Sequence, residues 1–231
     1  MKDETVKKVE QEVASCEYLS TLPDESFGFK LSREMKIEGD RYYIFSYDND
    51  EAHRWITAYY HDETKEYKIR EKVGLVEFCR IECIAEGIVK FEEALREHLA
   101  NIVSELGHFD IANLGELVRE KNIVAWDYKK LVPDTLLGFE LFIRPTEPVR
   151  MTNGSYIIID YEDFANESDF TIYYNIFRDE FFGESRIRKV PDITYDFDSR
   201  SLDELEAKLK TLMPVHLNKI RRCLAEEEEK K

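Results

Sequence analysis

The sequence is poor in the residues that build a disulfide scaffold or a low-complexity chain. It contains four cysteines, nine glycines and six prolines among 231 residues. Four cysteines are too few to cross-link a chain of this length, and none of them forms a Cys-x-x-Cys pair. We therefore expect reduced thiols. Hydrophobic residues make up 43% of the chain and aromatic residues 13%, which is enough for a packed core and indicates a globular protein.

Long apolar runs are also missing. No segment approaches the roughly 18 to 20 consecutive apolar residues that a membrane-spanning helix requires. The N-terminus, "MKDETVKKVEQEV", is charged and amphipathic, whereas a signal peptide has an apolar centre. These features predict a cytoplasmic protein without a membrane partner.

Positive charge is scarce relative to negative charge. Aspartate and glutamate number 49 against 33 lysines and arginines, which gives a formal net charge of -16. Such a field repels nucleic-acid phosphates and anionic lipids, so a nucleic-acid partner is not expected. Acidity of this kind suits a basic protein partner.

Common catalytic and cofactor motifs are absent. The chain has no P-loop, no dinucleotide-binding Gly-x-Gly-x-x-Gly, no His-Glu-x-x-His and no Gly-x-Ser-x-Gly. Cys79 and Cys83 are expected on one face of a strand, but no histidine accompanies them to complete a zinc site. His98 and His216 align with plain apolar residues elsewhere in the chain and are expected to pack at helix edges. We predict no catalytic residue, no metal, no cofactor and no enzymatic activity.

The most informative feature that is present is an internal repeat. "LPDESFGFKL" (22–31) recurs as "VPDTLLGFEL" (132–141), and "YYIFSYD" (42–48) aligns with "YIIIDYE" (156–162). In the same alignment Gly39-Asp40 falls on Asn153-Gly154, and both dipeptides are typical of two-residue hairpin loops. The repeat predicts two domains, residues 1–110 and residues 111–231.

Each copy carries strand signals followed by a helix signal. Alternating aromatic and β-branched residues predict strands over 27–37, 41–48, 54–61 and 66–84, with the last run divided at Gly74. An apolar stripe from Phe91 to Leu106 predicts a helix. In the second copy Ser201 and Glu204 form a capping box that begins the corresponding helix, which Pro214 should either kink or restart. Weaker patterns predict an initial helix in each copy, over 6–16 and 111–118.

Consecutive strands joined by tight turns favour an antiparallel arrangement over an α/β one. We therefore predict an α+β fold: a tandem duplication of an α-β(4-5)-α unit, with antiparallel sheets backed by helices in a pseudo-twofold arrangement. The segment 107–130 should link the copies, Trp126 should be largely buried, and unfolding should be cooperative. The layout is broadly similar to that of the Whirly and PC4-like single-strand-binding folds and of acidic secretion chaperones.

Strand alternation predicts which residues share a face of each sheet. Tyr43, Tyr47 and Tyr60, with Ile157, Tyr161 and Tyr174 in the second copy, are expected in the core. The opposite face carries polar and aromatic residues that recur in both copies, with Lys68 matched to Arg186 and Arg70 to Arg188. The candidate partner-binding residues are Tyr42, Thr57, Tyr59, Lys68, Arg70, Tyr156, Thr171, Tyr173, Arg186 and Arg188. The other interpretation of this face is ordinary packing, including packing against the sister copy.

Three functions are consistent with these patterns. The favoured one is a non-catalytic adaptor, chaperone or immunity-like protein that binds a protein partner through the duplicated tyrosine and arginine face. The alternative is single-stranded nucleic-acid binding, with Tyr42, Tyr59, Tyr156 and Tyr173 as stacking platforms. An enzyme acting on a small molecule is the third hypothesis.

Overall fold

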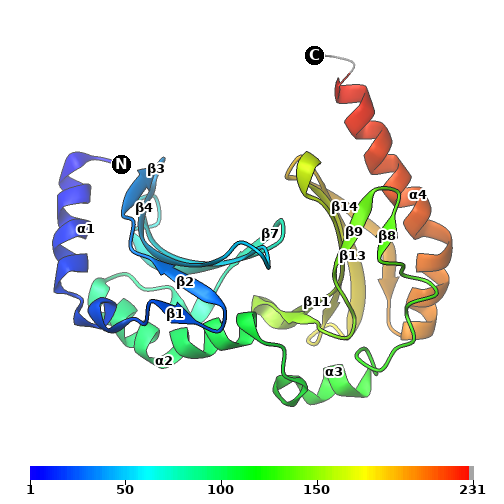
Figure 1. Cartoon of the computed structure of the whole chain (residues 1–231), viewed down its shortest axis with the longest axis horizontal. Helices are drawn as coiled ribbons and strands as arrows, with labels where there is room; N and C mark the ends of the chain where they lie inside the picture. The colour runs from blue at the N-terminus through cyan, green and yellow to red at the C-terminus, as the bar shows by residue number, and fades with distance from the viewer. Residues whose placement is uncertain (229–231) are drawn as a thin grey trace. The chain divides into compact units, whose positions relative to one another are not determined.

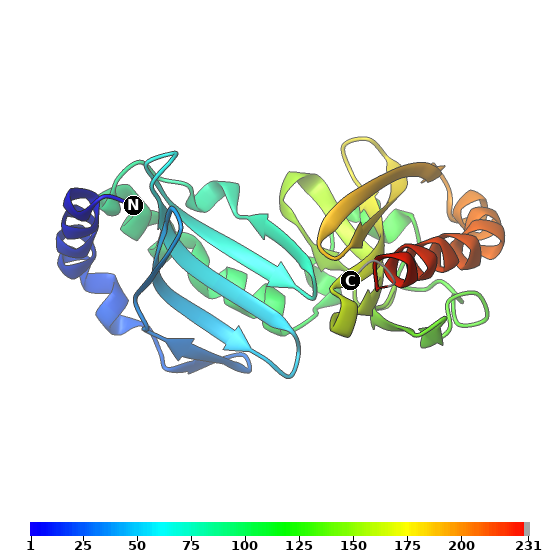
Figure 2. The same ribbon diagram turned by 90° about the horizontal axis from the view of Figure 1, so that it is seen from above.

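The computed structural model describes residues 1–228 and the side chains of residues 1–226. It is a mixed α+β protein that divides into two compact units, Met1–His108 and Phe109–Lys231 (Figures 1 and 2). Each unit contains a seven-stranded sheet in which the paired strands run antiparallel. Among the described residues, no helix is long and apolar enough to span a membrane.

The first unit begins and ends with a helix around its sheet. Its elements are α1 (Asp3–Ser15), β1 (Glu25–Ser26), β2 (Phe29–Ser32), β3 (Lys36–Glu38), β4 (Arg41–Asn49), β5 (Arg54–His61), β6 (Glu66–Val73), β7 (Val76–Cys79) and α2 (Ile88–Gly107). The sheet order is β1-β2-β4-β5-β6-β7, with β3 paired to β4. The predicted strands over 41–48 and 54–61 and the predicted division of residues 66–84 near Gly74 are confirmed, whereas the run 27–37 is divided into β2 and β3 and the last strand ends at Cys79.

The apolar stripe of α2 packs against one face of this sheet. Phe91, Leu95 and Leu99 are buried, and the Phe91 ring stacks on Tyr67 of β6 with 5.3 Å between ring centroids. In β6 buried and half-buried residues alternate strictly, so that one face of the strand packs on the helices and the other does not. Val9 and Val13 of α1 are also buried.

The second unit repeats the order of strands and ends in a long helix. Its elements are α3 (Glu116–Glu120), β8 (Thr135–Leu136), β9 (Phe139–Ile143), β10 (Val149–Arg150), β11 (Ser155–Asp163), β12 (Ser168–Asn175), β13 (Glu180–Ile187), β14 (Val190–Ser199) and α4 (Leu202–Glu228). The sheet order is β14-β13-β12-β11-β9-β8, with β10 paired to β11. Apolar residues of α4 join the core of this unit, among them Leu205, Leu209 and Leu217.

The predicted capping box is present at the start of α4. The backbone N–H of Glu204 donates to Ser201 Oγ at 3.2 Å, and the Glu204 carboxylate accepts from the backbone N–H of Arg200. Pro214 lies inside the helix, which continues beyond it and changes direction along its length (Figure 1). The predicted kink is thus accommodated within one continuous helix.

A β-bulge occurs at the same place in both sheets. In the first unit the register between β4 and β5 shifts between Tyr43 and Phe45. In the second unit the register between β11 and β12 shifts between Ile157 and Ile159. A bulge adds one residue to a strand and therefore reverses which residues face the core beyond it. Simple alternation along these strands consequently predicts some faces wrongly.

The opening repeat forms the same hairpin in both units. Phe27 and Gly28 have φ values of 48° and 84°, and Leu137 and Gly138 have values of 53° and 79°. Two consecutive positive φ values are typical of a type I′ turn, in which glycine avoids the strain that a Cβ atom causes. "SFGF" and "LLGF" therefore recur because the same tight turn joins β1 to β2 and β8 to β9.

Three local predictions are wrong. Ile81–Cys83 forms a turn of 3₁₀-helix, so Cys79 and Cys83 do not share one strand. Asn153-Gly154 is not a two-residue hairpin loop, because β10 ends at Arg150 and β11 begins at Ser155, although both loop residues have positive φ. The predicted helix over 111–118 is divided into a 3₁₀ turn and the short α3.

The segment 107–130 belongs largely to the core of the second unit. Leu114, Val118, Ile123 and Trp126 are members of that core, and Trp126 is 9% exposed. The Trp126 indole N–H donates to the Glu206 carboxylate of α4. The expectation that Trp126 is largely buried is confirmed, and its partners lie on the final helix.

Candidate functional site

Each sheet has one face that packs on the helices of its unit and a second face turned away from them, called here the helix-distal face. In the first unit this face carries Tyr43, Ser46, Asp48, Trp55, Thr57, Tyr59, Lys68, Arg70 and Lys72, and Figure 2 shows it uncovered by the helices of this unit. In the second unit it carries Ile157, Asp160, Glu162, Asp169, Thr171, Tyr173, Phe182, Glu184 and Arg186. The candidate site is built on these faces.

The bulges move two of the predicted binding residues to the other side of their sheets. Tyr42 pairs with the core residue Tyr60, and its hydroxyl donates to Met35 Sδ at 3.3 Å. Tyr156 pairs with Tyr174, and both belong to the core of the second unit. Tyr42 and Tyr156 are therefore core residues. The prediction placed them on the binding face because it assumed unbroken alternation.

The residues that follow Tyr42 and Tyr156 lie on the helix-distal face instead of in the core. Tyr43 and Ile157 were expected in the core, yet Tyr43 pairs with Tyr59 and Ile157 pairs with Tyr173 on the helix-distal faces. Tyr59 and Tyr173 were placed on this face correctly. Both are nonetheless buried, with 4% and 2% of their surfaces exposed.

In the first unit four predicted residues do lie together. Thr57 pairs with Arg70 and Tyr59 pairs with Lys68, so that all four side chains share the helix-distal face. Thr57, Lys68 and Arg70 are half-buried. The structure brings these residues together at one place on β5 and β6.

A groove with a volume of about 360 Å³ runs over this face. Its charged lining consists of five acidic and three basic residues: Glu34, Glu38, Asp48, Asp50, Glu77, Lys36, Arg70 and Lys72. Tyr43, Trp55 and Thr57 also line it. The groove is therefore polar, aromatic and mildly acidic.

Cations lie over the aromatic rings of the groove. The Arg70 guanidinium lies 6.0 Å from the centroid of Tyr43 and 5.7 Å from that of Tyr59, and it forms an ion pair with Glu77 at 3.1 Å. Lys72 Nζ lies 4.7 Å from the Trp55 ring, whose indole N–H donates to Asp50 at 3.0 Å. These contacts hold the charged heads in place before any ligand binds.

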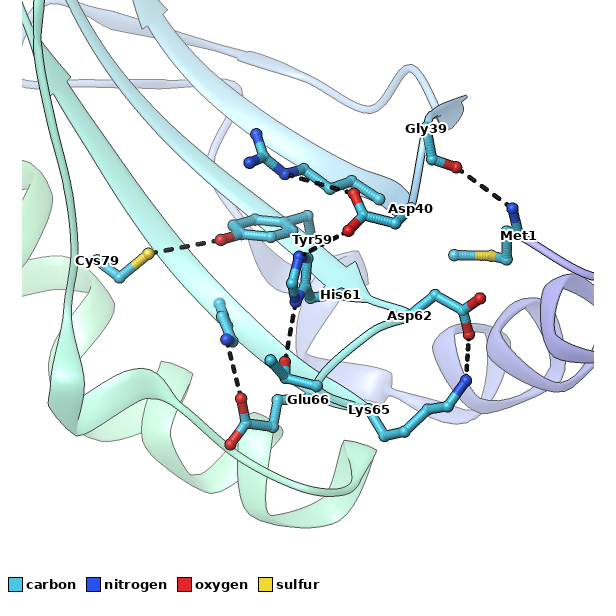
Figure 3. A network of polar contacts seen from close by, with 12 residues as sticks. Met1, Gly39, Asp40, Tyr59, His61, Asp62, Lys65, Glu66 and Cys79 are labelled. Carbon is cyan, nitrogen blue, oxygen red and sulfur yellow. Dashed lines mark hydrogen bonds and ion pairs between the residues drawn. The ribbon is translucent and has the colours of Figure 1, made fainter.

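Burial against the sheet changes the pKa values of two residues on this face, Asp48 and Tyr59. Burial raises the pKa of Asp48, although a hydrogen bond from Ser46 at 2.9 Å opposes the shift. Burial also raises the pKa of Tyr59, whose hydroxyl lies 3.4 Å from Cys79 Sγ (Figure 3). Tyr59 therefore remains a neutral phenol at physiological pH.

One end of the same face carries a candidate cation group. His61 Nε2 lies 3.0 Å from Asp40 Oδ2, and His61 Nδ1 lies 3.0 Å from Thr64 Oγ1 (Figure 3). Asp40, His61 and Glu63 place one ligand atom each within 4.8 Å of one another. Both histidine nitrogens already have partners, so the observed arrangement is that of a surface network rather than of a site prepared for a metal.

The second unit corrects the predicted matches of the basic residues. Because Tyr173 pairs with Phe182 as Tyr59 pairs with Lys68, the counterpart of Lys68 is Phe182. By the same register Glu184 is the counterpart of Arg70, since Thr171 pairs with Glu184. The prediction that Lys68 and Arg70 recur as basic residues in the second unit is therefore wrong.

Arg186 and Arg188 also have different surroundings from those predicted. Arg186 pairs with Asp169 across the strands and donates to its carboxylate at 2.5 Å. Arg188 lies in the turn between β13 and β14 with a φ of 49°, and its backbone N–H donates to Ser168 Oγ at 3.0 Å. Arg186 lies on the helix-distal face, opposite Asp169.

This face of the second unit contains a buried acidic cluster, formed by Asp160, Glu162 and Asp169. Their side chains place one oxygen each within 4.8 Å of one another, and their exposed fractions are 0%, 1% and 0%. Thr171 Oγ1 donates to Asp160 Oδ1 at 2.8 Å, so that a predicted binding residue is part of this site. Tyr173 lies beside it and accepts from Arg186 at 3.4 Å.

The carboxylates of the cluster repel one another and disfavour each other's ionised form. Burial, then the neighbouring carboxylates of Glu162 and Asp169, raise the pKa of Asp160 well above its ordinary value. Burial also raises the pKa of Asp169, with Arg186 opposing the shift. The helix-distal face of the second unit thus differs in chemistry from that of the first.

Sequence reasoning did not find this cluster. Asp160, Glu162 and Asp169 were hidden among 49 acidic residues, and strand patterns alone do not show that a carboxylate is buried. A signal was available, because Asp160 and Glu162 stand at alternate positions of an otherwise apolar run, "YIIIDYE".

Comparison with protein-family models, with curated proteins and with solved structures finds no match.

Proposed function

We propose that the protein binds another protein through the groove on the helix-distal face of its first unit. The observation that carries the proposal is the concentration of Tyr43, Trp55 and Arg70 in one groove beside a surplus of acidic side chains. Tyrosine, tryptophan and arginine are enriched where proteins bind one another, because they combine contact area with directed hydrogen bonds.

The acidic surplus indicates the chemistry of the partner. Glu34, Glu38 and Asp50 are exposed at the groove, and the whole chain has a formal charge of -16. The net negative charge would speed the association of a basic partner, and the exposed acids at the groove would form contacts with its basic segment. An adaptor, chaperone or immunity-like role is consistent with such a partner.

The nucleic-acid alternative has less support. It requires tyrosine rings that are free to stack on bases. Tyr42 and Tyr156 lie in the cores, and Tyr173 is stacked on Phe182 with 4.9 Å between ring centroids. Tyr59 is buried beneath Arg70.

We further propose that the two units arose by tandem duplication. In support, strands of equal length share the same bulge, and β1 and β8 lead into the same turn. A hydrogen bond recurs as well: Tyr47 Oη donates to the Pro23 carbonyl at 2.8 Å, and Tyr161 Oη donates to the Pro133 carbonyl at 2.6 Å. The predicted pseudo-twofold arrangement remains part of this proposal. Binding through one groove would then be a specialisation of the first copy.

The test uses matched charge changes on the two sides of the first unit. Glu34→Lys with Asp50→Lys reverses charge at the groove, whereas Glu86→Lys with Glu93→Lys makes the same net change at exposed positions before and within α2. Affinity capture from the source cell with each tagged protein, followed by mass spectrometry, compares them with wild type. We expect wild type and the α2 variant to retain the same basic protein and the groove variant to lose it. Equal retention by all three, or no protein above background with wild type, would contradict the proposal.

A further inference from the structure

We propose that Asp160, Glu162 and Asp169 form a binding site for an oxygen-preferring divalent cation, of the class of Ca²⁺, Mg²⁺ and Mn²⁺. The three residues come from the adjacent strands β11 and β12 and lie on the helix-distal face of the second unit. This site is separate from the groove of the first unit and does not depend on the proposed partner.

The ligand atoms have the spacing that a cation needs. Each carboxylate offers one oxygen, and these oxygens lie within 4.8 Å of one another. Oxygens bound to Ca²⁺ at about 2.3 to 2.6 Å, or to Mg²⁺ at about 2.1 Å, are separated by at most roughly 4 to 5 Å. The spacing therefore suits an ion of the size of Ca²⁺ directly, and a smaller ion such as Mg²⁺ after small movements of the side chains.

Two oxygens of the cluster have no hydrogen-bond donor. Asp160 Oδ2 and Asp169 Oδ1 are buried and unpartnered, whereas the other oxygen of each carboxylate accepts from Thr171 or Arg186. Leaving a buried carboxylate oxygen without a partner costs free energy, because it has lost water and gained nothing in return. These two oxygens are the independent indication that something is bound between the residues.

The fold itself does not require acids at these positions. By strand register, Asp160 corresponds to Ser46 and Asp169 corresponds to Trp55 of the first unit. A seven-stranded sheet of the same order is thus built there without the cluster. Glu162 alone has an acidic counterpart, Asp48, so the complete group of three acids is a feature of the second unit, as expected for a site that one copy has acquired.

The donor set selects the class of ion. All three ligands are carboxylates, and the hydroxyl oxygen of Thr171 is adjacent to Asp160. Hard cations prefer such oxygens, whereas zinc sites in proteins are dominated by histidine and cysteine. The cation would neutralise carboxylates that otherwise repel one another and would therefore stabilise the folded second unit.

The experiment compares full-length proteins after treatment with EDTA and dialysis. Ca²⁺, Mg²⁺, Mn²⁺ and, as a contrast, Zn²⁺ are each titrated by calorimetry, and thermal unfolding is recorded with and without each ion. The variants are Asp160→Asn and Asp169→Asn. Asp48→Asn is the matched control, because Asp48 occupies the position of Glu162 in the first unit, and Asp40→Asn disrupts the more exposed group of Asp40, His61 and Glu63.

We expect wild type, Asp48→Asn and Asp40→Asn to bind one ion of the Ca²⁺, Mg²⁺ and Mn²⁺ class per chain and to unfold at a higher temperature with it. Asp160→Asn and Asp169→Asn should lose at least about tenfold in affinity, with circular dichroism used to check that they fold. Absence of binding by wild type at millimolar concentrations of all three ions overturns the proposal, whether or not the variants fold. Unchanged affinity in a folded Asp160→Asn protein overturns it as well. If wild type binds no ion and Asp160→Asn unfolds at a higher temperature, the cluster holds a shared proton instead.

Discussion

At the scale of single residues, the first unit contains a buried ion pair that should make its stability depend on pH. Glu71 is completely buried, forms an ion pair with Arg80, and shares that arginine with Glu82 at 3.6 Å and Glu105 at 3.5 Å. Burial raises the pKa of Glu71 to about 7 from 4.5, although Arg80 opposes the shift. The neutral acid is thus favoured more strongly in the folded protein than in the unfolded chain.

A raised pKa in the folded state fixes the sign of the effect. The stabilising contribution of Glu71 is fully present below about pH 4.5 and is lost as the pH rises through about 7. We expect the free energy of unfolding of wild type, relative to that of Glu71→Gln, to fall by up to about 3 kcal/mol across this interval. Urea unfolding of both proteins at pH 4.5, 5.5, 6.5 and 7.5 measures the difference. The same difference at every pH would show that Glu71 does not titrate there.

A second residue-scale prediction concerns the equivalent tyrosines. Tyr47 and Tyr161 are both buried, and each donates its hydroxyl to a proline carbonyl, that of Pro23 or Pro133. Replacement by phenylalanine leaves the carbonyl without this donor, so each change should cost about 1 to 2 kcal/mol of stability. Chemical denaturation of Tyr47→Phe and Tyr161→Phe tests this. A loss in one unit and none in the other would argue against equivalent roles.

At the scale of elements, most of the fold follows from sequence patterns, while the details of the candidate site do not. The strands 41–48 and 54–61, the stripe from Phe91 to Leu106 and the capping box at Ser201 could be predicted because periodicity and turn chemistry are local. The bulges could not, since the inserted residue Ile44 is as apolar as its neighbours. One unrecognised bulge was enough to place Tyr42 on the wrong face.

The burial of Asp160 was likewise beyond a local pattern. It depends on which residues of other strands surround it, and pairing across strands is not visible in one sequence. The match of Lys68 to Arg186 failed for the same reason, because similarity of residue type competed with the true register of β6 and β13. The groove was therefore predicted in part, through Thr57 and Arg70, and the acidic cluster was not predicted.

The start of α4 provides a prediction at this scale. Ser201 Oγ accepts from the Glu204 backbone, and the Ser201 carbonyl accepts from Leu205 at 3.0 Å. Ser201→Ala removes only the side-chain acceptor, so we expect a loss of about 1 kcal/mol. Ser201→Gly should cost less, because glycine tolerates the capping conformation and leaves the end accessible to water. Thermal unfolding of both variants gives the order, and a greater loss with glycine would contradict this account of the cap.

At the scale of the whole molecule, two units of the same strand order carry different chemistry on corresponding faces. The first presents a groove of paired charges and aromatic rings, and the second buries Asp160, Glu162 and Asp169. The proposed duplication would account for this combination, because one copy can retain the framework while surface and buried positions diverge. The expected single cooperative unfolding of the chain remains a prediction, which scanning calorimetry of the full chain and of its separately expressed units would examine.

The central claim is that the helix-distal face of the first unit contacts a protein partner, and site-specific photo-crosslinking tests it most directly. A photoreactive phenylalanine analogue is placed at Thr57, in the groove, and at Lys90, which is exposed on α2. Both proteins are expressed in the source cell, irradiated and purified under denaturing conditions. The account predicts one crosslinked protein with the Thr57 probe and none of that protein with the Lys90 probe. The same crosslinks from both positions, or crosslinks from Lys90 alone, would contradict it.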